Sequence, residues 1–166
     1  MNEKCLAPYV PSHSLVIDTM LNLTKIIPGE RLYDLGAGDG RFLVRAASHP
    51  YYARAVGIEE NEKLVFVAER VIKSFNLQKR AEIIRGNIFD YDYHDADVIT
   101  LYLTRKQNKE LKSKLENELN NKARVVSHDF GMIGWKPSKV LSMVAPYGDS
   151  PVLKDTEIFL YKMNKI

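Results

Sequence analysis

Residues 31–41, RLYDLGAGDGR, decide the fold, because they join an apolar strand to a helix through a glycine-rich turn. Glycine adopts positive φ readily and has no Cβ, so a Gly-x-Gly-x-Gly turn lets the backbone approach a ligand closely. The dinucleotide fingerprint would need its third glycine at position 41, which is arginine, and no Gly-Lys-Ser/Thr of a P-loop follows. Asp34 and Asp39 place two carboxylates beside the turn, which suits a ligand with an ammonium group better than a pyrophosphate. The other interpretation is a tight strand–helix turn without a ligand.

Strand-like and helix-like segments alternate along the chain, with no internal repeat and no linker. Strands are expected at 31–35, 53–58, 81–85, 97–103, 123–127, 140–144 and 157–161. Helices are expected at 40–48, at 64–75 and around Leu111, Leu115 and Leu119. A first helix, capped by Ser12 or Ser14, carries Val16, Met20, Leu23 and Ile27 at helical spacing and stops at Pro28-Gly29. This alternation predicts a mostly parallel sheet with helices on both faces, in which ligands bind at the carboxyl ends of the strands.

The composition fits one soluble globular domain. The chain has 166 residues, of which 45% are hydrophobic and 27% charged, and this excludes disorder as the main state. Its single cysteine, Cys5, allows no intramolecular disulfide. The longest apolar stretch, Val98–Leu103, is too short to span a bilayer, and the first residues lack the apolar run of a secretory signal. We therefore expect a cytoplasmic protein that does not bind membranes.

The net charge of +3 is concentrated in residues 104–124, which hold seven Lys or Arg and three Glu. The simplest interpretation is the solvated face of a helix. An anionic partner such as RNA is the alternative.

The ends of the second and third expected strands carry polar side chains. Glu59 lies 23 residues beyond Gly36, close to the spacing at which doubly wound domains bind ribose hydroxyls through a carboxylate. The adjacent Glu60 is better placed to start the following helix. Asn87 follows the third strand, where its amide could bind a purine edge while Ile88 or Phe89 packs on the ring, although Gly-Asn is also an ordinary turn.

Taken together, these motifs resemble class I (seven-β-strand) S-adenosylmethionine-dependent methyltransferases, and more narrowly the small archaeal protein-lysine methyltransferases. The resemblance covers roughly residues 8 to 137. It rests on Pro8-Tyr9-Val10-Pro11-Ser12, on residues 33–41, on Val56-Gly57-Ile58-Glu59, on Gly86-Asn87, and on Val125-Val126-Ser127-His128-Asp129-Phe130. The glycine motif is specific for the superfamily only, whereas the first and last stretches indicate the narrower family.

The resemblance implies a Rossmann-like, doubly wound seven-stranded sheet in three α/β/α layers, mostly parallel with an antiparallel last strand. It implies one methyltransferase domain over residues 1–166, in which residues 1–28 cover the cofactor and 29–166 form the core. The implied S-adenosyl-L-methionine site has Asp34, Gly36, Ala37 and Gly38 around the methionyl part, Glu59 on the ribose, and Asn87 with Ile88 on the adenine. Tyr9 and Ser12 would fold over the cofactor.

Methyl transfer to lysine needs an aligned and neutral amine, and an aromatic channel disfavours the ammonium form. We therefore expect Tyr102, Tyr9 and Asp129 at the catalytic site, with Asp129 steering the ammonium and Phe130 as a further candidate. His128 is expected to be a packed or hydrogen-bonded residue, because neighbours on a strand alternate faces and cannot form a relay. No metal is expected, since His13, His49 and His94 are scattered.

Three functions follow from these expectations. The first is transfer of methyl groups to lysines of proteins, with the enzyme itself among the candidate substrates through its Lys109–Lys114 region, and with no need for nucleic acid. The second is the same chemistry on RNA or a small molecule; the absence of an Asp/Asn-Pro-Pro-Tyr/Phe signature weakens an adenine-N6 version of it. The third is a cofactor-binding module without activity, which need not keep Asp34, three glycines and Glu59 together.

Overall fold

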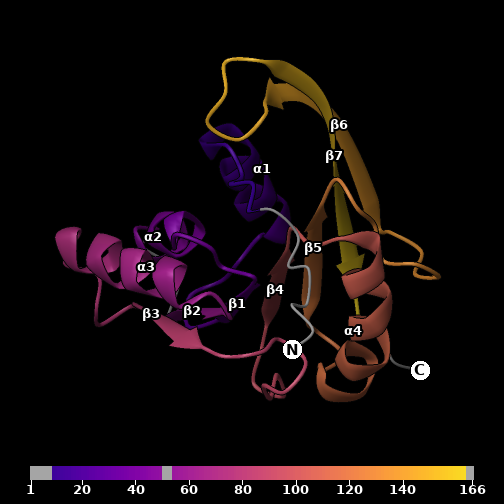
Figure 1. Cartoon of the computed structure of the whole chain (residues 1–166). Coiled ribbons are helices and arrows are strands. Elements are labelled where there is room, and N and C mark those ends of the chain that lie inside the picture. The colour runs from indigo at the N-terminus through magenta and orange to yellow at the C-terminus, as the bar shows by residue number, and fades with distance from the viewer. Residues whose placement is uncertain (1–8, 50–53, 164–166) are drawn as a thin grey trace, which may run out of the picture.

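The computed structural model describes residues 9–49 and 54–163 (Figure 1). The expectations that involved Cys5, Pro8 and Ala53 lie outside these residues. In chain order, the elements are α1 Ser14–Thr24, β1 Arg31–Leu35, α2 Arg41–Ala47, β2 Arg54–Glu59, α3 Glu62–Ser74, β3 Ala81–Arg85, β4 Val98–Leu101, α4 Arg105–Glu118, β5 Arg124–His128, β6 Lys139–Pro146 and β7 Leu153–Lys162.

The seven strands form one sheet in the order β3-β2-β1-β4-β5-β7-β6. Strands β1 to β5 pair in parallel, with Asp34 on β1 opposite Gly57 on β2 and Thr100 on β4. β7 lies between β5 and β6 and pairs antiparallel with both. The predicted seven-stranded sheet with an antiparallel last strand is confirmed.

Helices cover both faces of the sheet, but unequally. On one face, α1 and α2 pack their buried side chains on the strands together with Ile72 of α3. On the other face, α4 packs Leu111 and Leu115 on the sheet, and loop residues that include Tyr93 and Met132 fill the space beside it. The β6–β7 hairpin extends beyond these layers and arches towards α1 (Figure 1).

The first helix differs from its expected bounds. His13, rather than Ser12 or Ser14, is the N-cap, and its Nδ1 accepts the Leu15 N–H at 3.3 Å. The helix ends at Thr24 because Lys25 adopts a left-handed conformation with φ 47°, well before Pro28-Gly29. Ile27 therefore lies outside the helix and is 58% exposed.

The basic segment 104–124 is mainly the solvated side of α4. A capping box between Thr104 and Gln107 starts this helix, and Leu111, Leu115 and Leu119 are fully buried, as expected. On the outer side, Lys106, Lys112 and Lys114 each pair with the glutamate four residues further on. Paired lysines leave less free positive charge for a nucleic acid than the sequence count suggests.

Among the described helices, none combines the length and the apolar character needed to cross a membrane.

Candidate methyltransferase site

The parallel strands bring the predicted site residues to one edge of the sheet. Asp34 is the second-last residue of β1, and Glu59 is the last residue of β2. The other three lie just after strands: Asn87 after β3, Tyr102 after β4 and Asp129 after β5. Residues far apart in the chain thus lie at one edge of the sheet, because parallel strands end on the same side.

The glycine turn after β1 is held by the end of β2. The N–H groups of Gly36 and Ala37 donate to the Ile58 carbonyl at 2.9 and 3.1 Å. The Gly38 N–H donates to Glu59 Oε2 at 2.9 Å, and Asn61 N–H donates to the other carboxylate oxygen at 2.8 Å. The φ angles of Gly36 and Gly38, 81° and 56°, lie in the left-handed region, which explains the glycines. The glycine turn and the carboxylate of Glu59 therefore lie side by side, and the assignment of Glu59 to a ribose stays a prediction.

Asp34 is a buried carboxyl group whose charge is not balanced within the described residues. It is 7% exposed, and its Oδ1 accepts the Thr100 hydroxyl at 2.7 Å. Burial raises the pKa of Asp34 to about 7; the Thr100 hydrogen bond opposes this shift, and the charges of Glu59 and Asp39 add to it. No cation among the described residues forms an ion pair with Asp34. A ligand that brings an ammonium or sulfonium charge fits this position.

The segment before α1 lies on the turn and on the end of β5. The Tyr9 ring sits so close to Gly38 that a Cβ at Gly38 would lie 2.3 Å from it, and the Tyr9 hydroxyl accepts the Asp39 N–H at 3.4 Å. Burial, with the nearby charge of Asp39, raises the pKa of Tyr9 to about 12, so the phenol stays neutral. Ser12 Oγ hydrogen-bonds with His128 Nδ1 at 3.0 Å. This segment therefore bridges two of the five strand ends.

The side chain of Asn87 stabilises the loop after β3 through a hydrogen bond within the loop. Asn87 Oδ1 accepts the Phe89 N–H at 2.9 Å, which leaves the amide nitrogen for a ligand. Ile88 is 8% exposed and packs in the core on the α4 side, where its carbonyl accepts the Tyr93 hydroxyl. The assignment of both residues to an adenine site remains a prediction.

Tyr102 and His128 form an aromatic wall at the ends of β4 and β5. Their ring centroids lie 3.9 Å apart with planes tilted by 30°. Burial, followed by the negative charge of Asp129, raises the pKa of Tyr102 to about 12. Burial also lowers the pKa of His128 to about 4, against the opposing effect of Asp129. Both rings are thus uncharged near neutral pH, and His128 is the packed, hydrogen-bonded residue that was expected.

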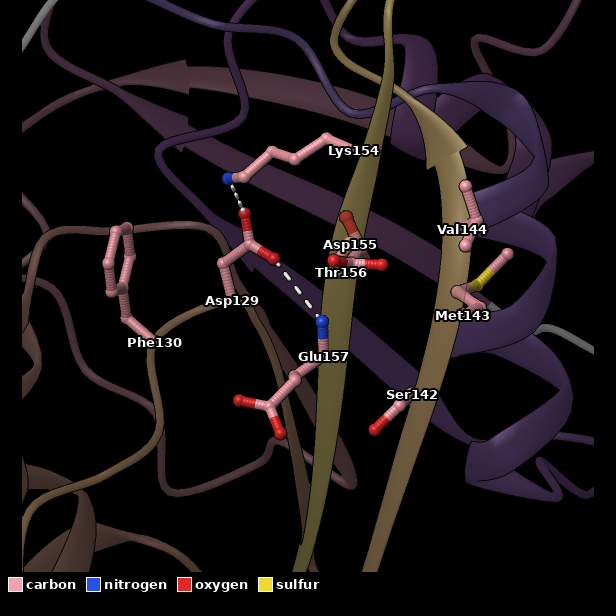
Figure 2. Close-up of a pocket in the computed structure, with 9 residues that line it drawn as sticks. All are labelled: Asp129, Phe130, Ser142, Met143, Val144, Lys154, Asp155, Thr156 and Glu157. Carbon is pink, nitrogen blue, oxygen red and sulfur yellow. Dashed lines mark hydrogen bonds and ion pairs between the residues drawn. The ribbon is translucent and has the colours of Figure 1, made fainter.

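Asp129 follows β5 with a left-handed φ of 58° and is fixed by β7. Its Oδ1 accepts the Glu157 N–H at 3.3 Å, and its own N–H donates to the Glu157 carbonyl at 2.7 Å. Its Oδ2 accepts a hydrogen bond from Lys154 Nζ at 2.8 Å (Figure 2). The carboxylate therefore points an ammonium-binding oxygen towards the β6–β7 hairpin.

Lys154 and Tyr147 were missed by sequence reasoning. Tyr147 lies in the turn after β6 and Lys154 near the start of β7, and the Lys154 ammonium lies 5.1 Å from the centroid of the Tyr147 ring. Tyr147 also contributes to the raised pKa of Tyr102, which places the two phenols near each other. The turn sequence of residues 146–151, PYGDSP, signals a hairpin, but nothing local indicates where its side chains point.

A second contact joins the tip of the β6–β7 hairpin to the end of the glycine turn. Arg41, directly after the turn, forms ion pairs with Asp39 at 2.8 Å and with Asp149 in the hairpin tip at 2.7 Å. Gly148 in the same tip packs against Pro11, since its Cβ position lies 3.5 Å from the Pro11 carbonyl oxygen. Arg41 therefore links the turn to the hairpin tip, and Gly148 brings the same tip against the segment before α1.

One group of described residues has metal-ligand spacing: Asp92, His94 and Glu118. His94 is one of the histidines that are scattered in the sequence and therefore suggested no metal site. Glu118 already pairs with Lys114 and accepts the Tyr93 N–H, and Asp92 with His94 is exposed. This group gives no support for a metal at the strand ends.

The fold and the site define a Rossmann-like methyltransferase: a seven-stranded sheet with β7 antiparallel, a glycine turn after β1, and a carboxylate from β2 bonded to that turn. The family model described as "ANTKMT methyltransferase domain" matches residues 34–139, and the chain belongs to this family.

The chain is also similar in sequence and in structure to proteins that are named methyltransferases. The chain is 40% identical over 136 residues to a protein-lysine N-methyltransferase of Saccharolobus islandicus, covering 82% of this chain and 84% of that protein. It is 31% identical to the mouse adenine nucleotide translocase lysine N-methyltransferase, covering 81% of this chain but only 58% of that protein. Among solved structures, an RNA methyltransferase from Salinibacter ruber in complex with S-adenosyl-L-homocysteine superposes with a TM-score of 0.83 at 34% identity, over 95% of each chain. The resemblance to class I S-adenosylmethionine-dependent methyltransferases is confirmed.

Proposed function

We propose that the protein transfers methyl groups from S-adenosyl-L-methionine to the ε-amine of lysine residues in proteins. The observation that carries this proposal is the Asp129 carboxylate beside the neutral Tyr102 ring, at the sheet edge that also holds the glycine turn. A carboxylate attracts an amine in its ammonium form, and a phenol wall suits its alkyl chain. The relative from Saccharolobus islandicus, named a protein-lysine N-methyltransferase, supports the same acceptor.

The residues around the turn fit the cofactor. Asp34 provides a buried carboxylate for a cationic group, Gly36, Ala37 and Gly38 leave room for close approach, and Glu59 can accept hydrogen bonds from a diol. When bound, S-adenosyl-L-methionine supplies a methyl group on a positively charged sulfur. Tyr9 and Ser12 would cover it, with Asn87 and Ile88 beside the adenine.

The acceptor side must deliver a neutral amine, because a free lysine with a pKa of about 10.4 is almost fully protonated at neutral pH. Asp129 binds the incoming ammonium. The neutral rings of Tyr102 and His128 then disfavour the charged form wherever water is excluded. The ammonium gives its proton to solvent water, and the neutral amine then takes the methyl group. In this proposal, Tyr102 and Tyr9 hold the amine in line, since a misplacement of about 1 Å can lower a rate by roughly a hundredfold.

The test is incubation of the purified protein with radiolabelled S-adenosyl-L-methionine and a cell lysate, followed by separate digestion with protease and with nuclease. We expect label that is removed by protease and resists nuclease, and mass spectrometry that locates added methyl groups on lysine. Label that only nuclease removes would overturn the lysine proposal.

A second candidate, methylation of RNA, is favoured by the name of the Salinibacter ruber structure. The same experiment decides between the two. The ion-paired lysines of α4 argue against RNA, because three of the basic side chains that the sequence suggested for it are neutralised.

Two further parts of the proposal concern the whole protein. We propose that residues 1–166 form one methyltransferase domain, which limited proteolysis of the full chain tests by yielding one resistant fragment. We also propose that the enzyme works in the cytoplasm, which cell fractionation with a specific antibody tests.

A further inference from the structure

A groove of about 590 Å³ lies beside Asp129. Its walls are Asp129 and Phe130 on one side, and residues 142–144 of β6 with residues 154–157 of β7 on the other (Figure 2). The groove therefore begins at the carboxylate that the proposed function assigns to the acceptor amine, and it continues along the β6–β7 hairpin.

Lys154 shows what kind of group suits the start of this groove. Its ammonium donates to Asp129 Oδ2 at 2.8 Å and lies 5.1 Å from the Tyr147 ring centroid. A carboxylate and an aromatic face together form the usual surroundings of a bound ammonium ion. Lys154 is itself 44% exposed, so this contact can open without disturbing the core.

The rest of the groove is acidic and not neutralised. Asp155 and Glu157 are exposed on β7, and within the described residues neither carboxylate forms an ion pair. Because side chains alternate along a strand, both point to the same face of the hairpin. Val144, opposite Asp155 on β6, is 58% exposed and gives this face an apolar part. Such a surface complements an extended chain with basic side chains.

We propose that this groove binds an extended, basic segment of the protein substrate, and that Lys154 occupies in the free enzyme the place of the substrate's lysine ammonium at Asp129. This inference rests on the proposed function. The substrate lysine displaces Lys154 from Asp129, and Asp155 with Glu157 attract the basic residues that flank it. The enzyme thus prefers lysines in basic surroundings, and a substrate lysine competes with Lys154 for the Asp129 carboxylate.

The test compares two synthetic peptides with one lysine each, flanked either by arginines or by alanines. Wild-type enzyme should methylate the arginine-flanked peptide with the lower KM. The double variant Asp155→Asn/Glu157→Gln should raise the KM of that peptide about three- to tenfold and leave the alanine-flanked peptide unchanged, in line with the modest worth of exposed charges. The matched control is Glu60→Gln/Glu69→Gln, which removes two exposed carboxylates elsewhere on the surface.

The variant Lys154→Met tests the displacement. It should lower the KM of the arginine-flanked peptide roughly two- to fivefold with little change in kcat, whereas Lys139→Met, at an exposed lysine of the same hairpin, should change neither. An unchanged or higher KM in Lys154→Met would overturn the displacement, and equal or absent methylation of the two peptides would overturn the basic groove. Wild-type enzyme that labels lysines in a lysate while failing these tests refutes this inference alone; if it labels no lysine at all, the proposed function fails first.

Discussion

We expect Asp34 to make the affinity for the cofactor depend on pH, because burial raises the pKa of its carboxyl group. In the free protein its pKa is raised to about 7 by burial, so close to pH 6 roughly nine-tenths of the molecules carry a neutral carboxyl. A cationic ligand needs the ionised form, and binding must then release a proton. The affinity should therefore be constant above about pH 7.5 and fall about tenfold for each pH unit below 7.

The same group should make the free protein less stable as pH rises. An acid whose folded pKa lies above its unfolded value costs stability from the unfolded pKa upward, so the loss develops between about pH 4 and pH 7. The variant Asp34→Asn keeps the oxygen that accepts the Thr100 hydroxyl but removes the charge. It should raise the free energy of unfolding at neutral pH by an amount on the order of 4 kcal/mol, while it abolishes the pH dependence and most of the binding.

Calorimetric titration with S-adenosyl-L-homocysteine at several pH values, in buffers of different ionisation enthalpy, measures both affinity and proton release. Thermal unfolding of the ligand-free proteins measures the stability. Affinity that stays constant between about pH 5.5 and 7.5, or an Asp34→Asn variant that keeps the wild-type pH dependence, would refute the assignment of Asp34 to a ligand cation.

Three further predictions concern other residues of the candidate site. Gly38→Ala should abolish cofactor binding because its Cβ has no room, whereas Gly29→Ala, at a glycine of similar backbone conformation in open space, should leave binding unchanged; calorimetry compares the two. Glu59→Ala should weaken binding by about 1–3 kcal/mol, and Glu60→Ala should not, so equal affinities would remove Glu59 from the ribose site. Tyr102→Ala should lower kcat far more than cofactor affinity, and full turnover in this variant would show that the ring only packs. Tyr102→Phe keeps the ring but removes the hydroxyl, so its kcat shows whether the hydroxyl orients the amine.

The cofactor side of the site was largely predictable from the sequence, because its contacts are set by local motifs. The glycine turn is contiguous, and Glu59 reaches it from the end of the neighbouring strand, so spacing and strand alternation were enough to bring them together. The sequence also placed Asp34 beside this turn, where its role in cofactor binding stays a prediction. What spacing did not show is that Thr100, from β4, is its hydrogen-bond partner.

The acceptor side was predictable only in part. The sequence pointed to Asp129 but not to its partner Lys154, because the first half of β7 is mostly polar and exposed and so lacks the apolar pattern of a strand. The sequence predicted a strand at 157–161, and the structure begins β7 at Leu153 because pairing with β6 continues past the core. The predicted end of the first helix was wrong because the apolar pattern continues beyond the helix. Ile27 fits the helical period, but the backbone leaves the helical conformation at Lys25.

The two sides of the site also differ in contact order. The Gly38–Glu59 hydrogen bond joins residues 21 positions apart, whereas Ser12 and His128 are separated by 116 positions and Asp129 depends on β7, which follows it by way of β6. Closing long loops slows folding, so we expect the turn and β2 to be in place early and the acceptor side to be completed only when β7 enters the sheet between β5 and β6. During synthesis, a nascent chain would then acquire its cofactor site before it can hold an acceptor amine, and methyl transfer would begin only with the finished sheet.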